Sequence, residues 1–118
     1  MSVRRVVPNL KSERFDESRN FYTEFLGFNI AMDMGWVVTF ASPSNPTAQI
    51  TLLAKSDSAT PHPDISIEVA DVDALHAKAV SRGLQIVYPL TDEPWGARRF
   101  YVVDPNGVVI NVMSHRKG

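Results

Sequence analysis

Residues 102–115, VVDPNGVVINVMSH, read as strand, tight turn, strand. In the turn Asp104-Pro105-Asn106-Gly107, proline presets φ and the Asn-Gly pair accepts positive φ. Apolar, β-branched runs flank the turn, which predicts a β-hairpin. Asn111 interrupts the second run, and an amide on a mostly apolar strand must find a polar partner. We therefore expect Asn111 to face a ligand or a neighbouring polar side chain.

The rest of the chain repeats one pattern twice: a strand, an amphipathic helix, a glycine and three strands. Gly27 and Gly83 are the predicted helix stops, and Asp71 or Asp73 is the predicted cap of the second helix. The predicted strands are 3–10, 28–34, 36–41, 48–54, 65–69, 84–88, 99–103 and 108–113, and the predicted helices are 15–26 and 72–82. The sequence therefore predicts a single α+β domain over 1–118. Its two modules, 1–56 and 62–116, are joined by a linker over 55–63. The longest predicted loop is PLTDEPWGA, 89–97.

Composition excludes several classes of protein. The 118 residues carry a net charge of −1 and no cysteine. Disulfides, thiolate nucleophiles and thiolate metal sites are excluded, and the charge predicts no nucleic-acid partner. No apolar run approaches membrane length, so we expect a soluble, cytoplasmic protein without a membrane partner.

Three stretches together resemble the vicinal oxygen chelate superfamily, the group of glyoxalase I, extradiol dioxygenases and bleomycin-resistance proteins. They are SRNFYTEFLGF (18–28), ISIEVADVDALHAKAVSRG (65–83) and RRFYVVDPNGVVINV (98–112). The resemblance covers nearly the whole chain. It implies two βαβββ modules forming a concave mixed sheet around a cavity, and a homodimer.

Metal-dependent members of that superfamily place four ligands on strands, usually His and Glu. The resemblance carries those positions onto Val7, Thr51, Asp64 and Asn111. Valine cannot ligate, and threonine and neutral asparagine are poor ligands for transition metals. We therefore expect no metal and no cofactor. An unorthodox site at His62, Asp64 and Glu68 is the alternative.

Strand alternation predicts which side chains share the cavity. It places polar and aromatic groups on one face of several strands, a surface suited to a small polar or mixed ligand. Asp64 and Glu68 are candidates for a general base; alternatively, they pair with Arg99 as structural ions or meet solvent at the mouth of the cavity. Arg99 itself binds an anionic group, forms that internal pair, or points outward, in which case Arg98 takes its place in the cavity. The predicted ligand-binding residues are Asn9, Trp36, Phe40, Thr51, Trp95, Arg99, Tyr101 and Asn111. For the tryptophans and for Phe40 and Tyr101, core or interface packing is the alternative.

Three functions follow as hypotheses. The first is a metal-independent protein that sequesters a small, partly aromatic ligand, as bleomycin-resistance proteins do. The second is a glyoxalase-like lyase or isomerase. It is metal-free, with Glu68 or Asp64 as proton shuttle, or it uses a shifted metal site. The third is a structural or regulatory dimer whose cavity is filled by side chains.

Overall fold

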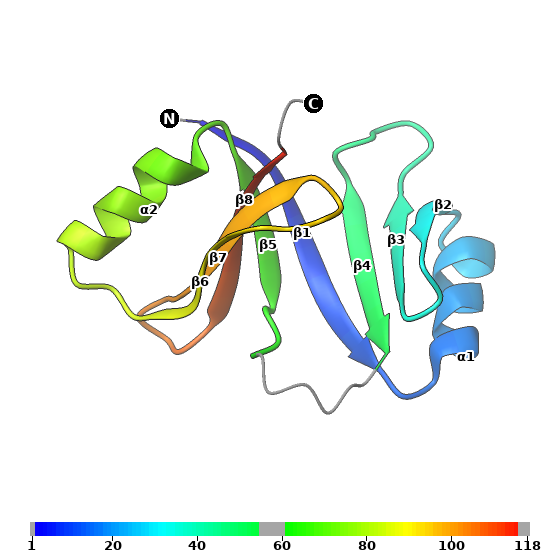
Figure 1. Cartoon of the computed structure of the whole chain (residues 1–118). Helices are drawn as coiled ribbons and strands as arrows, with labels where there is room; N and C mark the ends of the chain where they lie inside the picture. Colours follow the sequence, from blue (N-terminus) through cyan, green and yellow to red (C-terminus); the bar gives the residue numbers. More distant parts are fainter. Residues whose placement is uncertain (1, 55–60, 116–118) are drawn as a thin grey trace. The chain divides into compact units, whose positions relative to one another are not determined.

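The computed structural model describes residues 2–54 and 61–115. The fold is α+β, with a helical segment and strands in each half of the chain (Figure 1). The strands are β1 (Val3–Ser12), β2 (Asn29–Asp33), β3 (Val37–Ala41), β4 (Gln49–Ala54), β5 (Ile65–Val69), β6 (Ile86–Asp92), β7 (Ala97–Val103) and β8 (Val109–His115). The helical elements are α1 (Phe15–Asn20), a π-helical turn η1 (Phe21–Phe25) and α2 (Val72–Ser81).

The chain divides into two compact units that differ slightly from the predicted modules. Val6–Ser58 form an N-terminal unit, and Ala59–Gly118 form a C-terminal unit together with Met1–Arg5. The first residues of β1 thus group with the second half of the chain, because the Ala70 amide donates to the Ser2 carbonyl at 3.1 Å. Of the predicted linker, residues 55–60 lie outside the described residues, and residues 61–63 form no strand.

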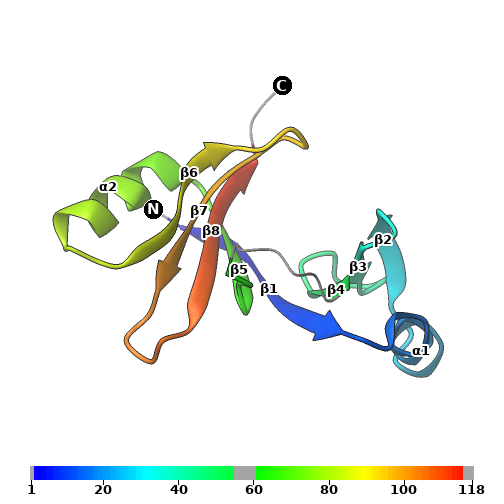
Figure 2. The same cartoon turned by 60° about the horizontal axis from the view of Figure 1, so that its bottom comes forward.

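In the C-terminal unit the strands lie in the order β5-β8-β7-β6. β5 and β8 are parallel, whereas β8, β7 and β6 are antiparallel neighbours. α2 packs against one face of these strands, as Figures 1 and 2 both show. The core on that side is apolar and consists of Val69, Val72, Ala79, Phe100 and Val112, with Ile67, Leu75, Ile86, Leu90, Val102 and Ile110 packed against it.

Local chemistry fixes the ends of α2 and the β7–β8 turn as predicted. Asp71 caps α2, its carboxylate accepting from the Ala74 amide at 3.1 Å, and Gly83 follows the helix with a φ of 67°. In the hairpin turn, Asp104 Oδ1 accepts from the amides of Asn106 at 2.8 Å and Val108 at 2.9 Å. These hydrogen bonds to the charged form hold the pKa of the Asp104 carboxyl below its usual value.

In the N-terminal unit the order is β2-β3-β4-β1, with β1 and β4 parallel. The predicted helix 15–26 is present, but its second half is a π-helical turn in which the Leu26 amide donates to the Phe21 carbonyl. This turn precedes Gly27, whose φ of 79° ends the helix as predicted. The apolar core contains Val38, Phe40 and Leu52, against which Phe15, Tyr22 and Phe28 pack.

The prediction of a long loop over 89–97 is wrong. β6 continues through Pro89 to Asp92, so the connection to β7 is the tetrapeptide 93–96. The proline is tolerated because β6 hydrogen-bonds only to β7 in this unit, and because their register shifts between Tyr88 and Thr91.

Candidate ligand-binding face

The face of β5-β8-β7-β6 opposite α2 carries a row of polar and aromatic side chains. Strand register aligns Tyr88, Tyr101, Asn111 and Ser66 across the four strands. Directly paired residues point to the same side of a sheet. Two contacts confirm the row: the rings of Tyr88 and Tyr101 stack with centroids 4.6 Å apart, and Asn111 Nδ2 donates to Ser66 Oγ at 3.0 Å.

A second row on this face is built around Arg99. Register aligns Thr91, Arg99, Met113 and Glu68. The Arg99 guanidinium carbon lies 5.3 Å from the ring centroid of Tyr88 and 5.1 Å from those of Trp95 and Tyr101. A guanidinium near an aromatic ring is attracted by the negative face of the ring, by about 0.5–2 kcal/mol per contact. Three rings therefore surround one cation.

Glu93 supplies the counter-charge to Arg99. Its Oε2 accepts from Arg99 Nε at 2.7 Å and lies 2.6 Å from Arg99 Nη2, and the Tyr88 hydroxyl donates to both carboxylate oxygens. The Glu93 side chain is 8% exposed and that of Arg99 is 20% exposed. The Glu93 backbone also closes the β6–β7 turn, because its amide donates to the Ala97 carbonyl at 2.7 Å. The turn thus holds the Glu93 carboxylate against Arg99, and Trp95 in the same turn is 55% exposed.

Tyr101 remains a neutral phenol in this cluster. Burial raises the pKa of the Tyr101 hydroxyl, because the ionised form would lose its solvation, while the positive charge of Arg99 opposes that rise. At neutral pH the Tyr101 hydroxyl is therefore a hydrogen-bond donor.

Asn111 is buried and only partly satisfied. It is 5% exposed, and in the described part of the chain no group donates to its Oδ1. A buried acceptor without a donor costs about 1–3 kcal/mol. Asn111 therefore has the predicted polar neighbour, because its Nδ2 donates to Ser66. Its oxygen accepts no hydrogen bond from the described residues.

The predicted pairing of Arg99 with Asp64 or Glu68 is wrong. Glu68 instead pairs with Arg5, with 2.9 Å between Nε and Oε1, and His115 Nε2 lies 4.0 Å from the same Glu68 oxygen. Asp64 is exposed ahead of β5. The alternative in which Arg98 replaces Arg99 on this face is also wrong, because Arg98 binds Asp73 in the first turn of α2, on the opposite face.

The remaining predicted ligand-binding residues lie in the N-terminal unit. Asn9, Thr51, Thr39 and Met32 form a row there, and the Oγ1 atoms of the two threonines are 3.4 Å apart. Phe40 lies in the core of this unit with no exposed surface, its ring 5.3 Å from that of Tyr22, so packing is the interpretation that its position supports. Trp36 is 54% exposed between β2 and β3.

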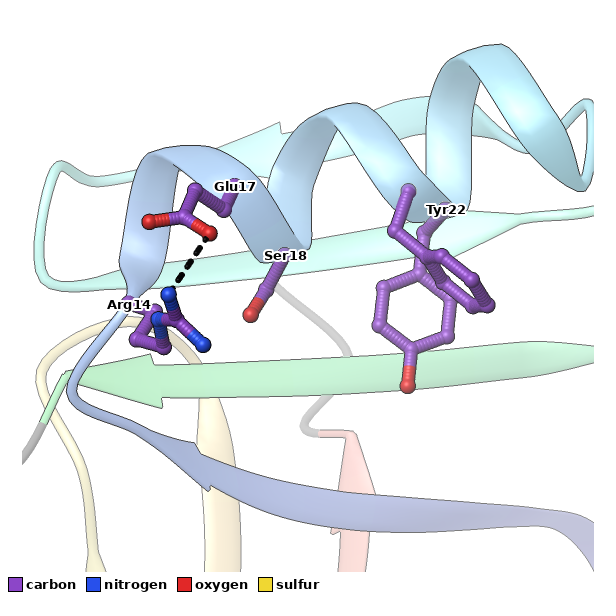
Figure 3. A pocket seen from close by; sticks show the side chains of 5 residues that line it. Arg14, Glu17, Ser18 and Tyr22 are labelled. Atoms are coloured by element: carbon purple, nitrogen blue, oxygen red, sulfur yellow. Dashed lines mark ion pairs between the residues drawn. The ribbon is translucent and has the colours of Figure 1, made fainter.

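A shallow depression of about 290 Å³ also lies in the N-terminal unit, over α1 and η1 (Figure 3). Arg14, Glu17, Ser18, Phe21 and Tyr22 line it. Arg14 and Glu17 form an exposed ion pair at 3.3 Å across its rim. Ser18 Oγ lies 3.1 Å from Ser12 Oγ. The two charged groups of this depression are therefore paired with each other, and Ser18 has a hydroxyl neighbour outside the lining.

Sequence reasoning missed two of the residues that contact Arg99, namely Tyr88 and Glu93. The sequence places Tyr88 in the correct strand, but its register opposite Tyr101 depends on the irregularity that follows it in β6. The sequence pattern places Glu93 in a long loop, whereas the structure places it in a tetrapeptide turn. The sequence does hold a signal for this contact. Glu93 precedes Pro-Trp-Gly and lies six residues before Arg99, a spacing that fits a hairpin in which a side chain of the turn contacts the second strand.

The comparisons with known proteins identify the family. The family model of the Glyoxalase/Bleomycin resistance protein/Dioxygenase superfamily matches residues 9–112. The chain therefore belongs to this superfamily. No curated protein matches the sequence.

Solved structures share the fold at low sequence identity. A superfamily member from Vibrio splendidus 12B01 is 18% identical, with a TM-score of 0.75 over 96% of this chain and 99% of that one. A hypothetical protein from Bacillus halodurans C-125 is 15% identical, with a TM-score of 0.75 over 100% and 98% of the two chains. An uncharacterized protein from Methanosarcina mazei is 20% identical, with a TM-score of 0.67 over 100% and 97%.

The residues at the superfamily's metal positions do not fit a divalent cation. Val7 is buried and has no donor atom, and the Asn111 nitrogen is bound to Ser66. Across residues 2–54 and 61–115, no three His, Asp or Glu side chains come together as a metal site would require. No helix in this part of the chain is long and apolar enough to cross a membrane.

Proposed function

We propose that this chain is a metal-independent binding protein for a small ligand that is partly aromatic and partly polar. The observation that carries the proposal is the convergence of three aromatic rings and an ion-paired arginine on one face of the C-terminal unit. Trp95 is exposed and offers a flat surface for stacking. Arg99 and Glu93 hold that surface in place, because the pair fixes the β6–β7 turn from which Trp95 projects.

The arrangement favours binding over proton transfer. Glu68, one of the two candidate bases, has an oxygen 2.9 Å from the Arg5 guanidinium, so the lone pairs that would take a proton already face a cation. Asp64, the other, lies exposed before β5. A general base must reach the proton that it abstracts within hydrogen-bond distance, in a site from which water is largely excluded.

Titration calorimetry with planar aromatic probes in the presence of EDTA tests this function. We expect saturable binding that Trp95→Leu weakens and Trp95→Phe, the matched control, largely keeps, because phenylalanine retains a ring for stacking. Equal affinity of Trp95→Leu and the wild type would place the ligand elsewhere. Binding abolished by EDTA would contradict metal independence.

We also propose that the protein forms a homodimer and resides in the cytoplasm. The dimer is supported by the apolar side chains that the N-terminal unit leaves exposed over 21–36. Exposed apolar patches on soluble proteins commonly mark interaction surfaces. The exposed side chains are Phe21, Phe25, Leu26, Ile30, Met32, Met34 and Trp36.

A further inference from the structure

Resting on the proposed binding function, we infer that the ligand is uncharged and presents an amide edge, an N–H beside a C=O, to Asn111 and Tyr101. Two independent features of the C-terminal unit carry this inference. One is the charge balance of the face, and the other is the hydrogen-bonding capacity that the face leaves open.

Both arginines of the face, Arg99 and Arg5, already have a carboxylate next to them. Arg99 is paired with Glu93 at 2.6 Å, and Arg5 is paired with Glu68 at 2.9 Å. The side chains of these four residues are at most 20% exposed. A carboxylate ligand would displace Glu93 from Arg99 or lie beside it on the same guanidinium, and a cationic ligand would lie beside Arg99. Each case either leaves a largely shielded protein charge without its partner or brings like charges together, and both are costly. A neutral ligand requires neither.

The open hydrogen-bonding capacity lies on two neighbouring strands. Tyr101 on β7 and Asn111 on β8 are directly paired in register, so their side chains leave the sheet side by side. Asn111 Oδ1 is an acceptor to which no described group donates. The Tyr101 hydroxyl accepts a hydrogen bond from Arg99, and as a neutral phenol it carries one proton of its own to donate. A donor and an acceptor in the same cross-strand row complement an amide edge, whose C=O accepts from Tyr101 while its N–H donates to Asn111.

Entry of a ligand requires neighbouring side chains to move, because Tyr101 and Asn111 are 3% and 5% exposed. The parts of the cluster already at the surface are Trp95 and, in part, Arg99. We therefore expect the ring of the ligand to lie toward Trp95 and its amide edge to lie deeper, at the Tyr101–Asn111 pair.

The test compares four bicyclic probes of nearly one shape by titration calorimetry against the full chain. They are quinolin-2(1H)-one, a lactam; its N-methyl derivative, in which the N–H donor is blocked; quinoline, which lacks the amide; and quinoline-2-carboxylate, which is charged. We expect the lactam to bind tightest. The N-methyl compound should bind roughly three- to tenfold more weakly, the loss typical of one net hydrogen bond. The carboxylate should bind more weakly still.

Two variants connect the preference to its residues. Asn111→Leu removes the acceptor at similar volume, and it should abolish the preference for the lactam over quinoline while quinoline still binds. Tyr101→Phe keeps the ring and removes the hydroxyl, and it should reduce the same preference. Circular dichroism melts establish that each variant is folded before it is titrated.

The outcomes separate this inference from the proposed function. Equal binding of the lactam, its N-methyl derivative and quinoline would overturn the amide edge and leave the planar-ligand function standing, with a buried water as the partner of Asn111. Tightest binding of the carboxylate would overturn the charge argument. Failure of all four probes to bind the wild type would overturn the proposed function itself.

Discussion

The Glu93–Arg99 pair gives the sharpest prediction about stability. Glu93→Ala leaves the Arg99 guanidinium among three rings without its counter-charge. Removing one partner of a fully buried ion pair costs about 3–5 kcal/mol. The Arg99 side chain is 20% exposed, so water solvates part of the orphaned charge. We therefore expect the free energy of unfolding to fall by roughly 2–3 kcal/mol. For a chain of this size that corresponds to a loss of about 8–12 °C in Tm.

Urea unfolding followed by far-UV circular dichroism measures this change. Glu17→Ala is the matched control, because it breaks the Arg14–Glu17 pair, whose side chains are 76% and 71% exposed. Exposed pairs of this kind contribute about 0–1 kcal/mol. Glu93→Gln keeps an acceptor for Arg99 and Tyr88, and it should lose only about half of the alanine effect.

A double-mutant cycle isolates the pair. In the double variant Glu93→Leu/Arg99→Met both charges are gone. Its loss should be smaller than the sum of the losses of Glu93→Leu and Arg99→Met measured singly, by at least about 1 kcal/mol. The reasoning fails if Glu93→Ala costs no more than Glu17→Ala, or if the two single losses simply add. Either result would mean that the guanidinium is well solvated without its partner.

Four further predictions follow. Asp104→Asn should make Tm less sensitive to acid. The folded-state pKa of the wild-type carboxyl is lowered, so its contribution to stability is present above about pH 4 and is lost as the pH falls through that pKa. Between pH 6 and pH 2.5 the Tm of the wild type should therefore fall more steeply than that of the variant. Phe25→Arg places a charge on a side chain that is 73% exposed in the proposed dimer surface. Sedimentation should detect folded monomer, whose melting temperature no longer depends on protein concentration. An unchanged oligomeric state would exclude this surface. Phe40→Leu should lower the free energy of unfolding by about 1–2 kcal/mol without changing affinity for the planar probes, and a selective loss of affinity would return Phe40 to the ligand site. Titration with Ni²⁺, Zn²⁺, Mn²⁺, Fe²⁺ or Mg²⁺ should leave Tm unchanged, whereas a saturable rise would reveal a metal site that the mapped positions do not supply.

Much of the fold follows from local sequence. Asp71 and Gly83 bound α2, and the Asp104–Gly107 turn forms the hairpin, because caps and turns depend on a few adjacent residues. Alternation also placed Arg99, Tyr101 and Asn111 on one face, since the side-chain period of a strand is two whatever surrounds it.

What the sequence could not determine is which charges meet. Arg5 and Glu68 are far apart in the chain and come together only because the start of β1 groups with the C-terminal unit. The Glu93–Arg99 contact depends on β6 continuing through Pro89, which shortens the following turn and folds the carboxylate back on the neighbouring strand. Ion-pair partners are selected by distances of a few ångströms between side chains, and strand register and turn length set those distances. Local patterns therefore determined the face, and the tertiary structure alone decided that its charges are paired and that the Asn111 oxygen is left open.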